Sequence, residues 1–153
     1  MLFLLFQLGA DRYALDARQV VEVLPLVNAK QIPLTPPAVV GVFNYRGAPV
    51  PLVDLSQLAL QRPAPQRLST RIILIEHPDN RGGKRLLGLV AEKVTDTLRR
   101  EPSEFLASGI SDRATPYLGP LVTDERGMVQ RIEVDQLLPP ALRELLFHAP
   151  AEI

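Results

Sequence analysis

The stretch of sequence that decides the fold is residues 39–55, which read VVGVFNYRGAPVPLVDL. Two apolar runs flank a short polar segment, Asn44-Tyr45-Arg46-Gly47, and this arrangement is typical of a β-hairpin. We expect Gly47 to take a backbone conformation that other residues rarely adopt. The turn then presents Arg46 at the rim of an apolar surface. An arginine held by a rigid hairpin in such a place has the character of an interface anchor.

Short apolar runs that end at turn residues recur along the rest of the chain and predict short β-strands. Sustained helical spacing occurs only near the C-terminal end, where Leu142, Leu145 and Leu146 fall on one face after Pro139-Pro140. Many short strands and one terminal helix indicate a mostly-β protein of barrel or sandwich architecture. The predicted strands cover residues 2–8, 13–15, 20–24, 39–43, 50–55, 71–76, 85–91, 94–98, 117–122 and 128–134.

Local residue types predict further detail. Asp16 stands at a helix N-cap position with Gln19 three residues later, which is the pattern of a capping box. Pro49 and Pro51 have no N–H donor, so their strand is expected at a sheet edge or in an irregular pairing. Residues 61–70 carry two prolines among polar residues and are predicted to form a flexible loop.

Composition excludes several classes of function. The 153 residues suit one ordinary domain, and their 17 basic and 17 acidic residues give a formal net charge of zero. Nucleic-acid affinity depends on an excess of basic residues facing phosphates, so a polyanion is not the expected partner. The absence of cysteine excludes disulfides, thiolate catalysis and cysteine-based zinc sites.

No motif in the sequence indicates catalysis. The two histidines are His77, expected as a surface or capping residue at a strand end, and His148, which follows the last predicted helix. Residues 82–84 (Gly-Gly-Lys) resemble a phosphate-binding loop only superficially, because Arg85 stands where that motif needs a hydroxyl. We therefore predict that the protein is not an enzyme and has no catalytic, cofactor-binding or metal-binding residue.

The remaining alternatives concern what the protein binds. The apolar residues 1–6 follow no basic segment and are too few to span a bilayer, so we expect no direct membrane insertion. A barrel that binds single strands stacks their bases on aromatic side chains, and this chain has no tryptophan and only 5% aromatic residues. A small β-barrel binding domain for a ligand or single-stranded nucleic acid is the alternative to a protein-interaction module.

The sequence resembles the CheW family of chemotaxis coupling proteins. That family is recognised by Gly-Val-x-Asn-Leu-Arg-Gly followed by an apolar run that ends in Pro-(Ile/Leu)-(Val/Ile)-Asp-Leu. Residues 41–47 and 51–55 match this pattern position by position, except that Tyr45 replaces the usual leucine. The resemblance continues in order over nearly the whole chain. Its other matching segments are residues 6–9, 13–16, 20–23, 87–90, 94–96 and 132–138.

The resemblance implies a fold and a role. The implied fold is mostly β: residues 1–150 would form one CheW-like domain of two intertwined, small, SH3-like five-stranded β-barrels with short helical turns and a C-terminal helix. The implied role is that of a non-catalytic cytoplasmic adaptor that couples the cytoplasmic tip of methyl-accepting chemoreceptors to the regulatory domain of a CheA-type histidine kinase. The output of the array, whether chemotaxis, surface sensing or type IV pilus control, stays open.

The resemblance also implies which residues face the partner. A receptor helix would lie in the groove between the barrels, with Val20, Glu22 and Arg46 on that groove. The signature turn, Asn44–Gly47, would hold Arg46 there. Tyr45 introduces a bulky ring with a polar tip into that turn, which suggests a changed groove or a different class of receptor.

Overall fold

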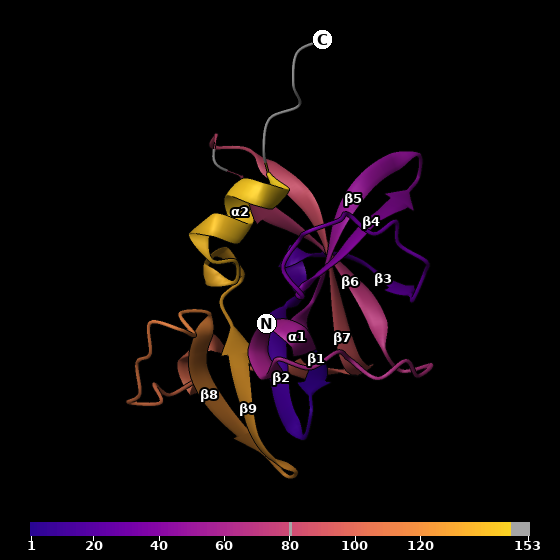
Figure 1. Ribbon diagram of the computed structural model, residues 1–153. Coiled ribbons are helices and arrows are strands. Elements are labelled where there is room, and N and C mark those ends of the chain that lie inside the picture. Colours follow the sequence, from indigo (N-terminus) through magenta and orange to yellow (C-terminus); the bar gives the residue numbers. More distant parts are fainter. Residues whose placement is uncertain (80, 148–153) are drawn as a thin grey trace.

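The computed structural model describes residues 1–79 and 81–147 (Figure 1). His148 and the last residues of the predicted 1–150 domain lie outside these ranges. Strands dominate the chain, and short helices occupy the connections. The elements in order are β1 (Leu2–Leu8), β2 (Asp11–Asp16), η1 (Ala17–Gln19), β3 (Val20–Pro25), β4 (Val39–Tyr45), β5 (Ala48–Asp54), α1 (Leu55–Leu60), β6 (Arg71–Pro78), β7 (Lys84–Arg99), η2 (Pro102–Glu104), β8 (Leu118–Asp124), β9 (Gly127–Ile132), η3 (Val134–Gln136) and α2 (Pro140–Leu146).

Strand β7 belongs to two sheets and joins the two halves of the molecule. Its residues 84–91 pair with β6, and its residues 92–99 pair with β1. One five-stranded group, barrel A, contains β1, β2, β8, β9 and the second part of β7; the other, barrel B, contains β3, β4, β5, β6 and the first part of β7. Figure 1 shows the two groups on either side of β7. The predicted pair of intertwined five-stranded barrels is confirmed.

The prediction of separate strands at 85–91 and 94–98 is wrong, because the chain continues as one strand. The change of sheet occurs at Lys93, whose φ of +47° is left-handed, and the register with β1 shifts at the same place. A bulge of this kind bends a strand without ending its pairing. The bend lets a single 16-residue strand contribute to both barrels.

Barrel B closes through the segment that links β3 to β4. Its sheet order is β3-β6-β7-β5-β4, so β3 and β4 stand at opposite ends. The amide of Lys30 donates to the carbonyl of Val42 at 2.8 Å, and the amide of Val42 donates back at 2.9 Å. These two bonds bring the ends together. The β3 strand and the β4–β5 hairpin are consequently neighbours in space.

The expected edge position of the proline-containing strand is half right. Leu52 and Val53 of β5 pair with β4 on one side and with β7 on the other, so this end of the strand is internal. Pro49 and Pro51 lie in the half that pairs with β4 alone. The prolines thus occupy the part of the strand where a missing donor costs no ladder bond on a second side.

The apolar side chains form three clusters, one inside each barrel and one in the seam between them. Strand β6 shows the division: Ile72 and Leu74 point into barrel B, whereas Ile73 and Ile75 join the seam. Because both faces of β6 are buried, its sequence is apolar without alternation. The cluster inside barrel A comprises Phe3, Leu5, Ala14, Phe105, Val122 and Val129.

The helical turns are short, and aspartates cap two of them, η1 and α1. The Asp16 carboxylate accepts from the amide of Arg18, which confirms the N-cap, but Gln19 forms no capping box. In α2, Pro140 is the first helical residue and Leu142 is buried, as expected. Leu145, on the apolar face predicted for this helix, is 48% exposed, so that face is only partly covered. None of the helices in the described ranges is long and apolar enough to cross a membrane.

Residues 61–70 form an irregular loop, as predicted, and several hydrogen bonds hold it. The Asp54 carboxylate accepts from the amide of Ala64 at 2.9 Å, and the Thr70 hydroxyl donates to the carbonyl of Pro65 at 2.6 Å. The amide of Thr70 also donates to the carbonyl of Arg67 at 3.0 Å. The flexibility of the loop stays a prediction.

His77 is fully buried, and the expectation of a surface or capping residue is wrong. Its ring packs against the ring of Phe147 at 5.2 Å, and its Nδ1 lies 2.7 Å from the carbonyl oxygen of Pro78. Because a carbonyl only accepts, Nδ1 carries the proton. Phe147, the residue that follows α2, covers the end of β6 at His77. No local sequence pattern indicates this contact.

Candidate partner-binding surface

The residues that the sequence singled out meet where barrel B closes. Glu22 comes from β3, and Tyr45 and Arg46 come from the β4–β5 hairpin. The hydroxyl of Tyr45 donates to Oε2 of Glu22 at 2.6 Å. The guanidinium of Arg46 lies 3.7 Å from the same oxygen. We call Glu22, Tyr45 and Arg46 the closure triad.

The signature turn holds Arg46 outward by its backbone geometry. Arg46 has a φ of +50° and Gly47 a φ of +87°, and Tyr45 pairs with Ala48 across the hairpin. Two successive left-handed residues form the type I′ turn that suits a two-residue hairpin. The carboxamide oxygen of Asn44 accepts from the amide of Gly47 at 2.8 Å. The conformation predicted for Gly47 is confirmed, and the Arg46 side chain is 77% exposed.

The closure triad also has a defined electrostatic arrangement. The Arg46 guanidinium carbon lies 5.2 Å from the centroid of the Tyr45 ring, within the range of a cation–π contact. The hydrogen bond to the Glu22 carboxylate raises the pKa of the Tyr45 hydroxyl above its ordinary value. The hydroxyl therefore keeps its proton at neutral pH and acts as a donor to Glu22.

Val20 and Val21 give this region an apolar side. Val20 begins β3, pairs with Ile75 and packs against the seam cluster, so it lies outside the polar triad. The register of β3 shifts between Val20 and Glu22, and Val21 at the shift is 45% exposed. Val21 could not be singled out from the sequence, because its exposure lies at an irregularity in pairing that the residue type does not signal.

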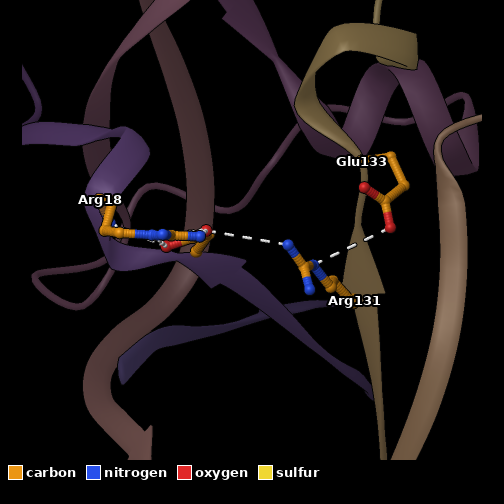
Figure 2. Close-up of polar contacts among 4 residues, drawn as sticks. Arg18, Arg131 and Glu133 are labelled. Carbon is orange, nitrogen blue, oxygen red and sulfur yellow. Dashed lines mark hydrogen bonds and ion pairs between the residues drawn. The ribbon is translucent and has the colours of Figure 1, made fainter. Parts of the chain in front are cut away.

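A second polar group fixes the place where β3 begins. Figure 2 shows Arg131 reaching from β9 between Glu133 and the carboxylate that Arg18 holds. That carboxylate belongs to Asp16, which lies 2.8 Å from Arg18 and 3.8 Å from Arg131; Arg131 lies 3.9 Å from Glu133. Since η1 and then β3 follow Asp16 directly, this group ties the start of β3 to barrel A.

The Asp16 carboxyl stays ionised in this setting. Burial alone would raise its pKa, but the hydrogen bonds from the Arg18 side chain and backbone, helped by the charge of Arg131, lower the pKa below its ordinary value. A buried charge is tolerated in a fold when it is paired and hydrogen-bonded. The group is thus a stable structural feature of barrel A at neutral pH, next to the residues that lead into β3.

The described residues hold no cluster of metal-binding side chains. In the described ranges, no group of three or more histidine, aspartate or glutamate side chains could hold a metal ion. A hollow of about 820 Å³ lies between the β3–β4 link and the loop at residues 63–70, and Val20, Glu22 and Arg46 do not line it. Glu22 and Arg46 instead lie on the outer surface, with side chains 37% and 77% exposed.

Two β-barrels that share one strand, with an exposed arginine where one of them closes, define the class as a two-barrel, mostly-β protein. The sequence matches the model of the CheW-like domain over residues 2–141. It is 30% identical over 142 residues to chemotaxis protein CheW of Klebsiella aerogenes, covering 89% of this chain and 80% of that protein. The chain belongs to the CheW-like family.

Other comparisons agree. Chemotaxis protein CheW of Rhizobium meliloti is 26% identical over 144 residues, which cover 91% of this chain and 88% of that protein. The crystal structure of the scaffolding protein TtCheW from Thermoanaerobacter tengcongensis superposes with a TM-score of 0.78 at 24% identity, covering 90% of this chain and 87% of that one. This likeness confirms the mostly-β fold with two SH3-like barrels.

Proposed function

We propose that the protein is a non-catalytic adaptor that couples methyl-accepting chemoreceptors to a CheA-type histidine kinase in a bacterial chemosensory array. Membership of the CheW-like family is the observation that carries this proposal. The partners are the cytoplasmic tip of the receptor and the regulatory domain of the kinase. The protein then works on the cytoplasmic side of the membrane and is held there by the receptor.

The receptor-facing surface of this adaptor contains Val20, Glu22 and Arg46. Glu22 and Arg46 are supported as one surface by their contact at 3.7 Å. Val20 and the exposed Val21 supply apolar area beside them. A helix that docks in a groove gains affinity from apolar anchors, and charged groups at the rim set its orientation.

The architecture suits transmission of a receptor signal without chemistry. Barrel B carries the proposed receptor surface, and the seam cluster and strand β7 connect it to barrel A. A displacement at one barrel therefore moves the other through a packed interior. An adaptor of this kind acts by binding one conformation of receptor or kinase better than the other.

Co-sedimentation with receptor-bearing membranes tests the proposal. The variants are Arg46→Glu and the matched control Arg126→Glu. Arg126 is also an exposed turn arginine that precedes a glycine, and it lies 3.8 Å from an acidic partner, Asp96, but it belongs to barrel A. We expect the wild-type protein and Arg126→Glu to sediment with the membranes, and Arg46→Glu, with unchanged circular dichroism, to stay in the supernatant.

Two results would count against the proposal. If the wild-type protein stays in the supernatant with every receptor and kinase of its host, the coupling role is wrong, and the small-barrel binding domain becomes the better hypothesis. If both charge reversals weaken sedimentation equally, the receptor surface is not centred on Arg46.

A further inference from the structure

Tyr45 is the position at which this chain departs from the family pattern, and the structure gives its side chain a specific partner. The family pattern has a leucine at this position, and a leucine side chain has no group to donate. The Tyr45 hydroxyl donates to Oε2 of Glu22 at 2.6 Å, a short, charge-assisted hydrogen bond. The departure from the pattern thus adds a polar link between β4 and β3.

This hydrogen bond limits the interaction that the Glu22 carboxylate makes with Arg46. Oε2 of Glu22 is held by the hydroxyl, and the nearest approach of Arg46 to it is 3.7 Å, longer than a hydrogen bond. Within the described ranges the Arg46 side chain donates no hydrogen bond, and it is 77% exposed. Its planar group of donors is therefore available to an acceptor outside the chain.

The ring of Tyr45 also helps to keep the Arg46 guanidinium available to a partner. It lies under the Arg46 guanidinium at 5.2 Å from ring centroid to guanidinium carbon, and the type I′ turn fixes the backbone of Arg46. A guanidinium that is already oriented loses less freedom when it binds a partner. The acceptor that matches its forked geometry on a protein helix is the carboxylate of an aspartate or glutamate.

We propose that Tyr45 is a specificity-determining residue of the receptor surface: its hydroxyl holds Glu22 so that Arg46 stays free to bind a carboxylate on the receptor tip. This inference rests on the proposed function. Tyr45 acts through Glu22 and Arg46, as a positioning residue, and its aromatic ring need not touch the receptor.

Removal of the hydroxyl allows Glu22 to turn toward Arg46 and compete with the receptor carboxylate. Exposed ion pairs are weak, so we expect Tyr45→Phe to raise the dissociation constant by about threefold to fivefold. In a Glu22→Gln background no carboxylate remains to compete. There the same Tyr45→Phe change is expected to leave the dissociation constant as it was in Glu22→Gln alone.

The test is a double-mutant cycle of Tyr45→Phe and Glu22→Gln, with Arg46→Gln as the reference for loss of the cation. Binding is measured by calorimetry against the cytoplasmic fragment of a methyl-accepting receptor from the same organism. A parallel set of receptor fragments has each acidic residue of the tip changed to its amide in turn. We expect one of these amide changes to weaken wild-type binding while leaving that of Arg46→Gln unaffected.

The outcomes separate this inference from the proposed function. If the wild-type protein binds no receptor fragment, the proposed function fails and takes this inference with it. If the wild-type protein binds but Tyr45→Phe binds equally well, or loses the same factor in both backgrounds, the function stands and the role of Tyr45 is overturned. The role of Tyr45 is also overturned if every amide change at the receptor tip affects the wild-type protein and Arg46→Gln equally.

A spectroscopic measurement checks the hydrogen bond in solution. Absorbance of the tyrosinate form reports titration of the three tyrosines, and the Tyr45→Phe variant identifies the contribution of Tyr45. The carboxylate of Glu22 raises the pKa of Tyr45. We expect Glu22→Gln to lower the pKa of Tyr45, and an unchanged titration would show that the bond does not form.

Discussion

The backbones of Gly41 and Lys30 meet so closely that no side chain fits between them. A Cβ atom on Gly41 would lie 2.1 Å from the carbonyl oxygen of Lys30. That carbonyl accepts the amide of Val42 and so takes part in the closure of barrel B. The glycine in the Gly-Val match to the family pattern is therefore required by close approach of two backbones, within the strand β4 that leads into the signature turn.

The first prediction concerns this contact. Gly41→Ala forces the link at Lys30 away from β4, and we expect it to lower the free energy of unfolding by about 2 to 3 kcal/mol, in the range of an overpacked core. The control is Gly47→Ala, whose Cβ meets no atom within 4 Å but which keeps a left-handed φ. That change should cost only about 1 kcal/mol. Urea denaturation measures both, and equal losses would disprove the role of the close approach.

The second prediction concerns the ion pair between Arg12 in β2 and Asp124 at the end of β8. Its two parallel hydrogen bonds measure 2.7 and 2.6 Å, and both side chains are largely buried. We expect Asp124→Asn to lower the free energy of unfolding by about 1 to 3 kcal/mol at pH 7, since it weakens bonds to a charged group. Denaturation of the two proteins under the same conditions gives this difference.

The pH dependence of that difference follows from the pKa of Asp124. The hydrogen bond from the Arg12 side chain holds the pKa of the Asp124 carboxyl well below its usual range in the folded protein. In the unfolded chain the carboxyl of Asp124 has an ordinary pKa of about 4. The stabilisation is therefore complete above that pH and is lost progressively as the pH falls below it. The gap between wild type and Asp124→Asn should narrow steadily as the pH falls from about 4 to about 2. A constant gap over this range would contradict the assignment.

The third prediction concerns His77, the buried histidine beneath α2. Burial lowers the pKa of its imidazole below the ordinary value; the nearby charge of Arg143 in α2 also lowers it, while the carbonyl of Pro78 and the charge of Asp135 in η3 oppose the shift. The folded protein keeps His77 neutral at a pH where the unfolded chain takes up a proton. Stability is therefore unaffected above about pH 6.5 and falls as the pH drops below it.

The variant His77→Leu isolates this effect. The absolute stability of this variant does not isolate the effect of the proton, since the leucine also changes the packing against Phe147. The informative quantity is the slope of the unfolding free energy against pH between about 6.5 and 5, which should be smaller in His77→Leu than in the wild type. Equal slopes would show that His77 is accessible to protons in the folded state.

The parts of the fold that depend on local interactions could be predicted from the sequence. The β4–β5 hairpin and the conformation of Gly47 follow from two apolar runs around a turn that needs a left-handed residue. The continuity of β7 could not be predicted, because the left-handed residue at its bend is Lys93 and not a glycine. A lysine gives no signal for such a bend.

The candidate site shows the same limit. Arg46 was singled out from its own hairpin, but its neighbour Glu22 was placed only through the family resemblance, and the bond between Tyr45 and Glu22 could not be foreseen. It joins residues 23 positions apart through closure of a barrel. The burial of His77 likewise depends on where Phe147 packs after the last helix. Contacts of this kind are set by tertiary packing, which residue types alone do not specify.

The measurement that tests the central claim most directly is the phosphorylation rate of the kinase in receptor-bearing membranes, with and without the protein and with and without a ligand of the receptor. An adaptor that couples the two partners should raise the rate and make it respond to the receptor ligand, and Arg46→Glu should do neither while Arg126→Glu does both. A rate that the wild-type protein leaves unchanged, at concentrations where it sediments with receptor and kinase, would contradict the account.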